Sequence, residues 1–179
     1  FLLNKELWLL RLLKKRFVYE FHGSDLRNPE LAYKKTGQPV FKHAVLNPKI
    51  KKKNEKICKY AKSIILHDDE LISHLPKEHG DVFVVPLRVD PMQFTPVYPE
   101  VETDTIKIVH APSKRSVKGT EYVISAVEKL NEKYNIELIL VENTPQEEAR
   151  RIYATADIIV DQLVIGTYGV FSIEGMALG

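Results

Sequence analysis

Apolar residues follow two alternating patterns along this chain. Short runs rich in β-branched and aromatic residues predict strands at residues 16–21, 63–66, 81–85, 106–110, 136–141 and 157–161. Apolar positions three or four residues apart predict helices at residues 2–15, 29–33, 48–62, 69–75, 120–133 and 145–155, and a last helix that begins near Gly169 or Val170. Regular alternation of strands and helices predicts an α/β architecture with parallel sheets.

Local signals mark several helix boundaries. Asn28-Pro29 and Asn47-Pro48 each predict a helix start, because asparagine caps a helix and proline suits its first turn. Thr144-Pro-Gln-Glu147 has the spacing of a capping box. The first helix carries apolar residues on more than one face, so we expect it to be well buried. These residues are Leu7, Trp8, Leu9, Leu10 and Leu13.

Prolines interrupt the pattern between residues 86 and 105, which predicts a linker. They are Pro86, Pro91, Pro96 and Pro99. We therefore expect two domains, residues 1–96 and 106–179, joined by a linker at residues 97–105. Ligands of parallel α/β sheets bind beyond the carboxyl ends of the strands, and the cleft between two such domains is a natural site.

Composition narrows the class of protein. The 179 residues are 44% hydrophobic and 28% charged, as in ordinary globular proteins, and the net charge of +2 is too small to indicate nucleic acid. Cys58 is the single cysteine, which excludes an internal disulfide and suits a reducing cytoplasm. No apolar run is long enough to predict a transmembrane helix. Because the chain starts at Phe1 and stops within or just after a helix, we expect it to be a piece of a longer protein.

The end of the chain carries the most informative motif, Gly166-Thr-Tyr-Gly-Val-Phe-Ser-Ile-Glu174. A glycine-bearing loop after a strand lets the backbone approach a ligand. A helix start at Gly169, Val170 and Phe171 offers free N–H groups to an anion. Glu174, one turn further along, can accept hydrogen bonds from sugar hydroxyls. Neighbouring sites for a phosphate and a ribose indicate a nucleotide.

This motif, together with the preceding Asp161-Gln-Leu and the following Gly175-Met-Ala-Leu-Gly179, resembles the donor-site signature of the retaining glycosyltransferases of family four (glycosyl transferases group 1). The resemblance implies the GT-B fold, with two Rossmann-like parallel-sheet domains that are both incomplete in this chain. Residues 1–96 would belong to the acceptor-side domain and residues 106–179 to the nucleotide-sugar-binding domain. Glu174 would hold the ribose. The family's first glutamate, which contacts the donor sugar, aligns with Gly166, and a subset with Asp-Gln-Leu and Gly-x-Tyr-Gly shares that replacement.

A basic loop follows the predicted strand at residues 106–110. It carries Ser113, Lys114, Arg115, Lys118 and Gly119. Cations that converge at the carboxyl end of a strand suit a diphosphate, although a run of charges also suits a solvated loop. A similar loop of the family has an arginine followed by Lys-Gly, so the resemblance implies that Lys118 and Gly119 clamp the donor diphosphate. Strict spacing places the arginine at Ser113, whereas the chain offers Arg115.

Histidines suggest two further possibilities. His22 follows the first predicted strand, and the resemblance implies that it binds the donor sugar; the alternative is a plain turn. The run His67-Asp68-Asp69, with His74 and His79 nearby, lacks the usual spacing of metal ligands, and Asp69 is expected to cap the next helix. We therefore expect no metal and no other cofactor, with the nucleotide sugar as substrate.

Lysines cover the polar face of the helix at residues 48–62. They are Lys49, Lys51, Lys52, Lys53, Lys56 and Lys59. A solvated face is the simple interpretation, and peripheral contact with anionic lipid headgroups, at about 1 kcal/mol per cation, is the alternative. No aromatic residues are interleaved with the lysines, so nucleic acid is not an expected partner. The expected location is cytoplasmic, with contact at the inner face of the membrane as the alternative.

Taken with the resemblance, these features predict a retaining hexosyltransferase-type enzyme. It would move a sugar from a nucleotide diphosphate, such as UDP, to the hydroxyl of a saccharide or lipid-linked acceptor in glycan, polysaccharide or glycolipid synthesis. Lys118, Arg115 and the amides around Gly169 would stabilise the leaving diphosphate. Two alternatives are a GT-B-like partner subunit without catalysis, which Gly166 favours slightly, and a nucleotide-sugar epimerase of the same fold, for which the chain nominates no acid/base carboxylates.

Overall fold

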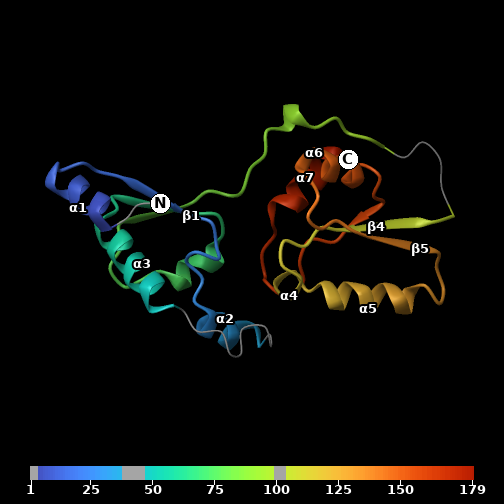
Figure 1. The fold of residues 1–179 in the computed structure, drawn as a ribbon, viewed down its shortest axis with the longest axis horizontal. Coiled ribbons are helices and arrows are strands. Elements are labelled where there is room, and N and C mark those ends of the chain that lie inside the picture. The colour runs from blue at the N-terminus through green and yellow to red at the C-terminus, as the bar shows by residue number, and fades with distance from the viewer. Residues whose placement is uncertain (1–3, 38–46, 99–103) are drawn as a thin grey trace. The chain divides into compact units, whose positions relative to one another are not determined.

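The computed structural model describes residues 4–37, 47–98 and 104–179 and shows a mixed α/β chain (Figure 1). The chain divides into two compact units, Phe1–Pro86 (unit 1) and Leu87–Gly179 (unit 2). Each unit contains a three-stranded sheet whose strands are all parallel. The predicted α/β class, with a parallel sheet on each side of the proline-rich segment, is therefore confirmed.

The sheet of unit 1 has the order β1-β2-β3, so β2 lies in the middle. The strands run in register, with Phe21 beside Leu66 and Leu66 beside Val84. In chain order, unit 1 contains α1 (Asn4–Leu12), β1 (Val18–Phe21), α2 (Pro29–Thr36), α3 (Pro48–Tyr60), β2 (Ser63–Leu66), the 3₁₀ helix η2 (Asp69–His74) and β3 (Asp81–Val84).

Asparagine caps start two of these helices, as the sequence predicted. The Asn28 side chain accepts a hydrogen bond from the backbone N–H of Glu30, and that of Asn47 accepts one from Lys49. Proline follows each cap in the first turn. For η2 the prediction was wrong by one residue, because the capping side chain is Asp68, which accepts from the N–H of Glu70, and not Asp69.

The core of unit 1 forms where β1 and β2 meet α3 and the segments around them. Its buried residues are Leu7, Phe21, Leu26, Ile57, Cys58, Ala61, Ile64, Leu66 and Leu71. The expectation that α1 is well buried is wrong. Leu7 is 5% exposed, but Leu9 is 47% and Leu13 is 56% exposed. The reason is that α1 packs against α3, and a helix with a neighbour on one side buries a single stripe. Residues 2 and 3 and the Trp8 side chain lie outside the described part.

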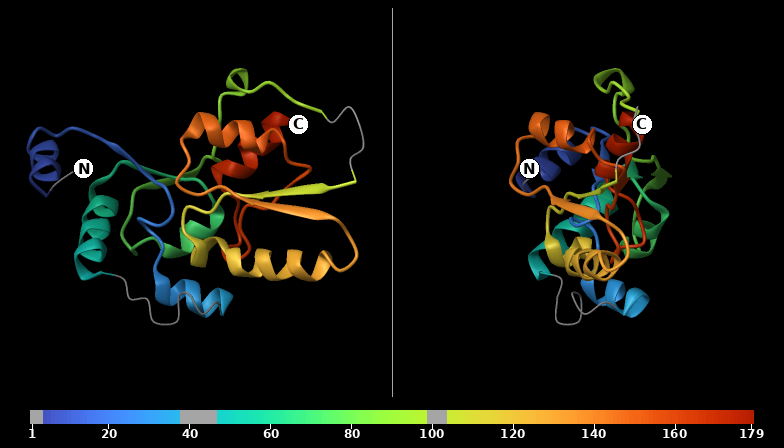
Figure 2. Two further views of the ribbon diagram at one scale, coloured as in Figure 1. Left: turned by 45° about the vertical axis from the view of Figure 1, so that its right-hand side comes forward. Right: turned by 90° about the vertical axis from the view of Figure 1, so that its right-hand side faces the viewer.

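Unit 2 has the strand order β5-β4-β6, with β4 in the middle. Figures 1 and 2 show α5 on one face of this sheet and α6 and α7 on the other, which gives three layers. Buried Val109, Val141, Ala149 and Phe171 form the core between the sheet and the α6/α7 layer. In chain order, unit 2 contains the 3₁₀ turn η3 (Pro91–Gln93), β4 (Ile106–His110), α4 (Arg115–Lys118), α5 (Thr120–Leu130), β5 (Ile136–Leu140), α6 (Gln146–Tyr153), β6 (Ile158–Ile159) and α7 (Val170–Leu178).

Two features of unit 2 differ from the sequence prediction. Residues 87–96, expected in the first domain, group with unit 2. Phe94 is 8% exposed there, and the centroid of its ring lies 4.6 Å from the guanidinium carbon of Arg150. The predicted capping box at Thr144 does not form: α6 begins one residue later, and the Thr144 hydroxyl donates to the Glu142 carbonyl instead. Of the predicted linker, residues 99–103 lie outside the described part.

Candidate functional site

Three donors converge on one carboxylate at the start of α7. Lys118 Nζ lies 2.5 Å from Asp161 Oδ1. The backbone N–H of Gly169 donates to Asp161 Oδ2, and the Ser172 hydroxyl donates to the same oxygen over 2.9 Å. These groups are mostly shielded from water, with 13% of the Lys118 side chain and 7% of the Asp161 side chain exposed. We call Lys118, Asp161, Gly169 and Ser172 the anion site, because a cation and a helix start favour negative charge there.

The strands bring the parts of the anion site together. β4 and β6 are parallel neighbours, so the segments that follow them leave the same edge of the sheet. Lys118 lies in the segment after β4, and Asp161 and Gly169 lie in the segment after β6. A Cβ atom at Gly169 would lie 2.9 Å from Lys118 Nζ and 3.0 Å from Asp161 Oδ2, so only glycine fits there without displacing them. The two segments that the sequence assigned to a diphosphate therefore meet.

Gly119 and His110 fix the loop that carries Lys118. Gly119 has a φ of 77°, a left-handed conformation that glycine adopts easily, and it ends α4 where α5 begins. His110 is fully buried at the end of β4. Its Nδ1 donates to the Val160 carbonyl over 2.6 Å, and its Nε2, 2.9 Å from the Thr120 hydroxyl, accepts from it. This histidine ties β4 to the end of β6 and to the start of α5.

Glu174 lies on α7 and is 6% exposed. Its Oε1 accepts hydrogen bonds from Arg150, with Nη2 at 3.0 Å and Nε at 3.2 Å, and from Gln146 Nε2 at 3.4 Å. Arg150 and Gln146 both belong to α6, so Glu174 links the two helices on the same face of the sheet. All three of these contacts engage Oε1.

Arg115 points to a different partner. Its guanidinium makes a bidentate contact with Glu142, with Nη2–Oε2 at 2.7 Å and Nε–Oε1 at 3.0 Å, and also lies 3.4 Å from Glu121. The hydrogen bonds from Arg115 lower the pKa of Glu142, and those to Glu142 raise the pKa of Arg115. Arg115 would have to leave Glu142 to reach a diphosphate. Ser113 is exposed in the same loop.

Gly166 lies beside an open depression of about 600 Å³ that also borders the anion site. Asp161, Thr167, Tyr168 and Ser172 are among its lining residues. A Cβ atom at Gly166 would meet no atom within 4 Å. The position at which the resembling family carries its first glutamate therefore has free space in this chain.

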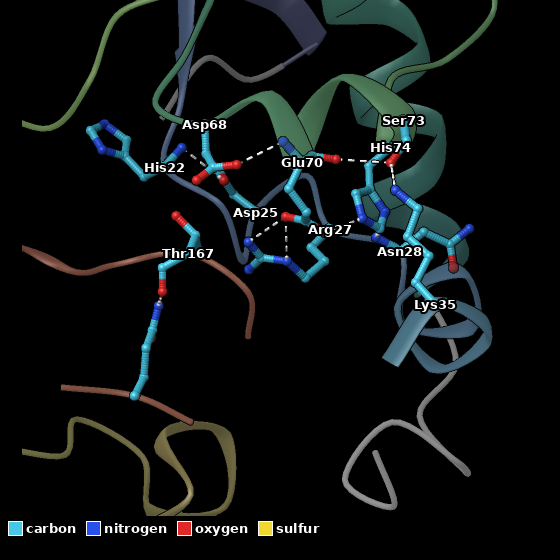
Figure 3. Close-up of polar contacts among 11 residues, drawn as sticks. His22, Asp25, Arg27, Asn28, Lys35, Asp68, Glu70, Ser73, His74 and Thr167 are labelled. Atoms are coloured by element: carbon cyan, nitrogen blue, oxygen red, sulfur yellow. Dashed lines mark hydrogen bonds and ion pairs between the residues drawn. The ribbon is translucent and has the colours of Figure 1, made fainter. Parts of the chain in front are cut away.

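His22 lies in unit 1, directly after β1, and its side chain is exposed. The backbone N–H of His22 donates to Asp25 Oδ1 over 3.0 Å, which closes the turn at Gly23. Arg27, further along the same loop, binds Glu70 through Nη2 at 2.9 Å and Nε at 3.2 Å. This contact holds the His22 loop against η2 (Figure 3).

His74 completes the network around Glu70 (Figure 3). The backbone N–H of Asn28 donates to His74 Nδ1 over 3.0 Å, so the ring proton is on Nε2, which donates to Glu70 Oε1 over 2.7 Å. Burial alone would raise the pKa of Glu70, but hydrogen bonds from His74 and Arg27, together with the charge of Arg27, outweigh it and hold this pKa at about 2.

We expect Glu70→Gln to lower the free energy of unfolding by roughly 1–3 kcal/mol at neutral pH, because the three hydrogen bonds that its carboxylate accepts from Arg27 and His74 are weakened. The folded pKa of about 2 lies below the ordinary value of 4.5, so the carboxylate contributes its stability above pH 4.5 and loses it as the pH falls toward 2. Urea unfolding between pH 2 and 7 should therefore show the variant and the wild type converging in acid. The exposed Glu55→Gln is the control, and a difference for Glu70→Gln that stays constant with pH would contradict this account.

The predicted lysine face is present on α3. Lys49, Lys51, Lys52, Lys56 and Lys59 are exposed, and Lys53 is half-buried. Several of them border a depression of about 650 Å³ together with Lys77 and Tyr60. Glu78 contacts Lys59 at 2.9 Å and offsets part of the charge. Contact of this face with anionic lipid remains a prediction.

Sequence reasoning missed the acidic and hydroxyl members of the anion site. Asp161 was named only as part of the Asp161-Gln-Leu motif, and Ser172 and Arg150 were given no role. A signal was present for Ser172, because it follows Gly169 by three residues, where a hydroxyl faces the start of its own helix. For Arg150 no local signal exists, since its partner Glu174 lies on another helix.

Comparison with protein-family models finds no family that matches this chain, and comparison with curated proteins finds no match either. Within the described residues, none of the helices combines the length and the apolar character needed to cross a bilayer.

Proposed function

We propose that this protein transfers a sugar from a nucleotide-diphosphate donor to an acceptor hydroxyl with retention of configuration, on a GT-B scaffold. The observation that carries the proposal is the convergence of Lys118 Nζ, the Gly169 N–H and the Ser172 hydroxyl on one anionic group. A phosphate oxygen accepts hydrogen bonds from the same three kinds of donor. The resemblance of residues 161–179 to a donor-site signature supports the same assignment.

The diphosphate would bind beside Asp161, in the depression that Thr167, Tyr168 and Ser172 line. The first turn of α7 offers further donors there, because the N–H groups of Val170 and Phe171 have no acceptor within their own helix. Lys118 would turn its ammonium group from Asp161 to the phosphate oxygens. Asp161 would keep its hydrogen bonds with Gly169 and Ser172 and so hold the start of α7 in place.

Catalysis would come mainly from charge stabilisation. Negative charge builds on the leaving diphosphate as the glycosidic bond breaks, and a donor already aimed at that charge lowers the barrier by about 3–4 kcal/mol. Lys118 takes this role together with the amides at the start of α7. Arg115 takes a lesser one because Glu142 already holds its guanidinium. Glu174 would accept the ribose hydroxyls through Oε2, and His22 remains the predicted contact for the donor sugar.

The direct test is to measure binding of UDP, ADP, GDP, uridine and inorganic pyrophosphate by calorimetry and by the shift in melting temperature. A ligand that binds only the folded protein stabilises it by about 2.7 kcal/mol at a hundred times its Kd. We expect at least one nucleoside diphosphate to bind, and pyrophosphate to bind more weakly than that nucleotide. If neither pyrophosphate nor any nucleoside diphosphate binds, the proposal is wrong.

A second function, a GT-B-like partner without catalysis, is favoured by one observation. Gly166 leaves open space where the resembling family has a sugar-binding carboxylate. The two functions differ in what happens after binding. A transferase hydrolyses its nucleotide-sugar donor slowly when no acceptor is present, whereas a binding subunit returns the donor intact. Release of nucleotide from the sugar donor that binds best therefore separates them.

A further inference from the structure

A group of potential metal ligands lies at the carboxyl ends of β1 and β2 in unit 1. Glu20 is in β1, His22 comes directly after β1, and His67 comes directly after β2. Glu20 and His22 are two residues apart in an extended segment, so they share a face. β1 and β2 are neighbours with Phe21 beside Leu66, which brings the two following histidines together. Their ring centroids are 5.0 Å apart.

His67 presents a free lone pair to this group. Its Nδ1 lies 3.0 Å from the Val85 carbonyl oxygen, which can only accept, so Nδ1 carries the proton and Nε2 of the neutral ring does not. The His67 side chain is 8% exposed. Within the part of the chain that the structure describes, Nε2 of His67 is the buried side-chain atom without a hydrogen-bond partner. A buried polar nitrogen in this state destabilises the fold unless another group satisfies it.

The carboxylate of Glu20 faces that nitrogen. Glu20 Oε1 lies 3.2 Å from His67 Nε2, yet their directions do not make a hydrogen bond. Two atoms that both carry lone pairs repel each other at this distance, unless a positive charge lies between them. A metal ion satisfies both atoms at once. Ligands of Zn²⁺ stand about 3.3 Å apart when each bond is about 2.0–2.1 Å long, which fits the separation of Glu20 and His67.

We propose that Glu20, His22 and His67 bind a divalent transition-metal ion of the Zn²⁺ type. The ligand atoms of all three lie within 4.8 Å of one another, and the exposed His22 ring would move toward the other two to complete the set. Two imidazoles and one carboxylate are ligands that Zn²⁺ binds well, and such three-residue sites keep one position open for water or substrate. The hydrogen bond from His67 to Val85 has the form of the outer contact that orients metal-bound histidines.

This site is independent of the proposed sugar transfer. Its ligands all belong to unit 1, whereas the anion site belongs to unit 2. Binding through one ring nitrogen of His22 leaves the other N–H able to donate to a sugar, so the two roles of His22 are compatible. Hard cations such as Mg²⁺ prefer oxygen ligands and should bind poorly to a set with two imidazoles.

The test is a titration of the metal-free protein with Zn²⁺ in competition with a chromophoric chelator, without any nucleotide. We expect one equivalent to bind at micromolar concentration or tighter, and Mg²⁺ at millimolar concentration not to compete. His22→Ala, an exposed position, should weaken Zn²⁺ binding at least tenfold. His79→Ala is the matched control, because His79 is also exposed and lies outside the group.

Glu20→Gln gives a second variant that keeps the size of the side chain and removes its charge, and it should also weaken Zn²⁺ binding at least tenfold. The melting temperature should rise with Zn²⁺ in the wild type and in His79→Ala, and much less in His22→Ala. If the wild type binds no Zn²⁺, or if His22→Ala and Glu20→Gln bind it as the wild type does, the site does not exist. These metal titrations contain no nucleotide, so their outcome does not decide the nucleotide-binding test of the proposed sugar transfer.

Discussion

Lys118→Ala should lower turnover at saturating nucleotide-sugar donor by about 100- to 1000-fold, the usual effect of removing one donor that stabilises the transition state. In this structure Lys118 is the mostly buried cation of the anion site, 2.5 Å from Asp161. The loss should appear in kcat more than in the affinity for the donor, because charge on the diphosphate increases as the glycosidic bond breaks. The measurement is steady-state kinetics with the donor that binds best.

Two controls separate this effect from a loss of structure. Lys114→Ala removes an exposed lysine four residues earlier in the same loop and should change turnover little. Lys118→Ala also leaves the Asp161 carboxylate without its cation, so the double variant with Asp161→Asn should recover stability while remaining inactive. If Lys118→Ala keeps wild-type turnover, or if Lys114→Ala loses as much, Lys118 does not act on the leaving group.

Glu174→Ala should weaken the binding of UDP, or of whichever nucleoside diphosphate binds best, by about 10- to 100-fold, since hydrogen bonds to a charged group contribute about 1.5–3 kcal/mol. Its affinity for inorganic pyrophosphate should not change, because pyrophosphate has no ribose to contact Glu174. Lys118→Ala should differ from Glu174→Ala and weaken the binding of both the nucleotide and pyrophosphate. Calorimetry with the two ligands on the two variants therefore assigns each residue to one part of the donor.

The exposed Glu147→Ala is the matched control for Glu174→Ala, as it removes a carboxylate from the first turn of α6. Glu174→Gln adds a finer comparison, because an amide oxygen can still accept from Arg150 but carries no charge. If the affinity for pyrophosphate falls together with that for UDP, Glu174 acts by holding α6 against α7 through Arg150 and does not bind ribose.

The sequence predicted the features that local chemistry decides. The asparagine caps at Asn28 and Asn47 were found because a cap and its proline neighbour are adjacent in the chain. Burial of α1 was predicted wrongly because burial depends on how many neighbours a helix has, and the leucines do not encode that number. The approach of Lys118 to Gly169 was expected from the resemblance, and it occurs because the segments after the parallel neighbours β4 and β6 leave the same edge of the sheet.

Contacts between distant segments were harder to foresee. Asp161 and Lys118 were both visible, but their pairing depends on which of several nearby groups the fold brings together. Along the chain, His67 stands next to Asp68 and Asp69, and this run was the predicted candidate for metal ligands. Glu20 and His22 were not part of that candidate, because only the pairing of β1 with β2 brings them beside His67.

Asp161 has a consequence for which solutes the anion site can admit. In the free protein the Asp161 carboxylate already neutralises Lys118. A dissolved anion must therefore compete with a carboxylate that belongs to the same chain and has a very high local concentration. Chloride or acetate offers no more charge than Asp161 and gains nothing by the exchange. A pyrophosphate group carries several negative charges and can displace Asp161 from Lys118. Asp161 would therefore make the site selective for diphosphates over monovalent anions.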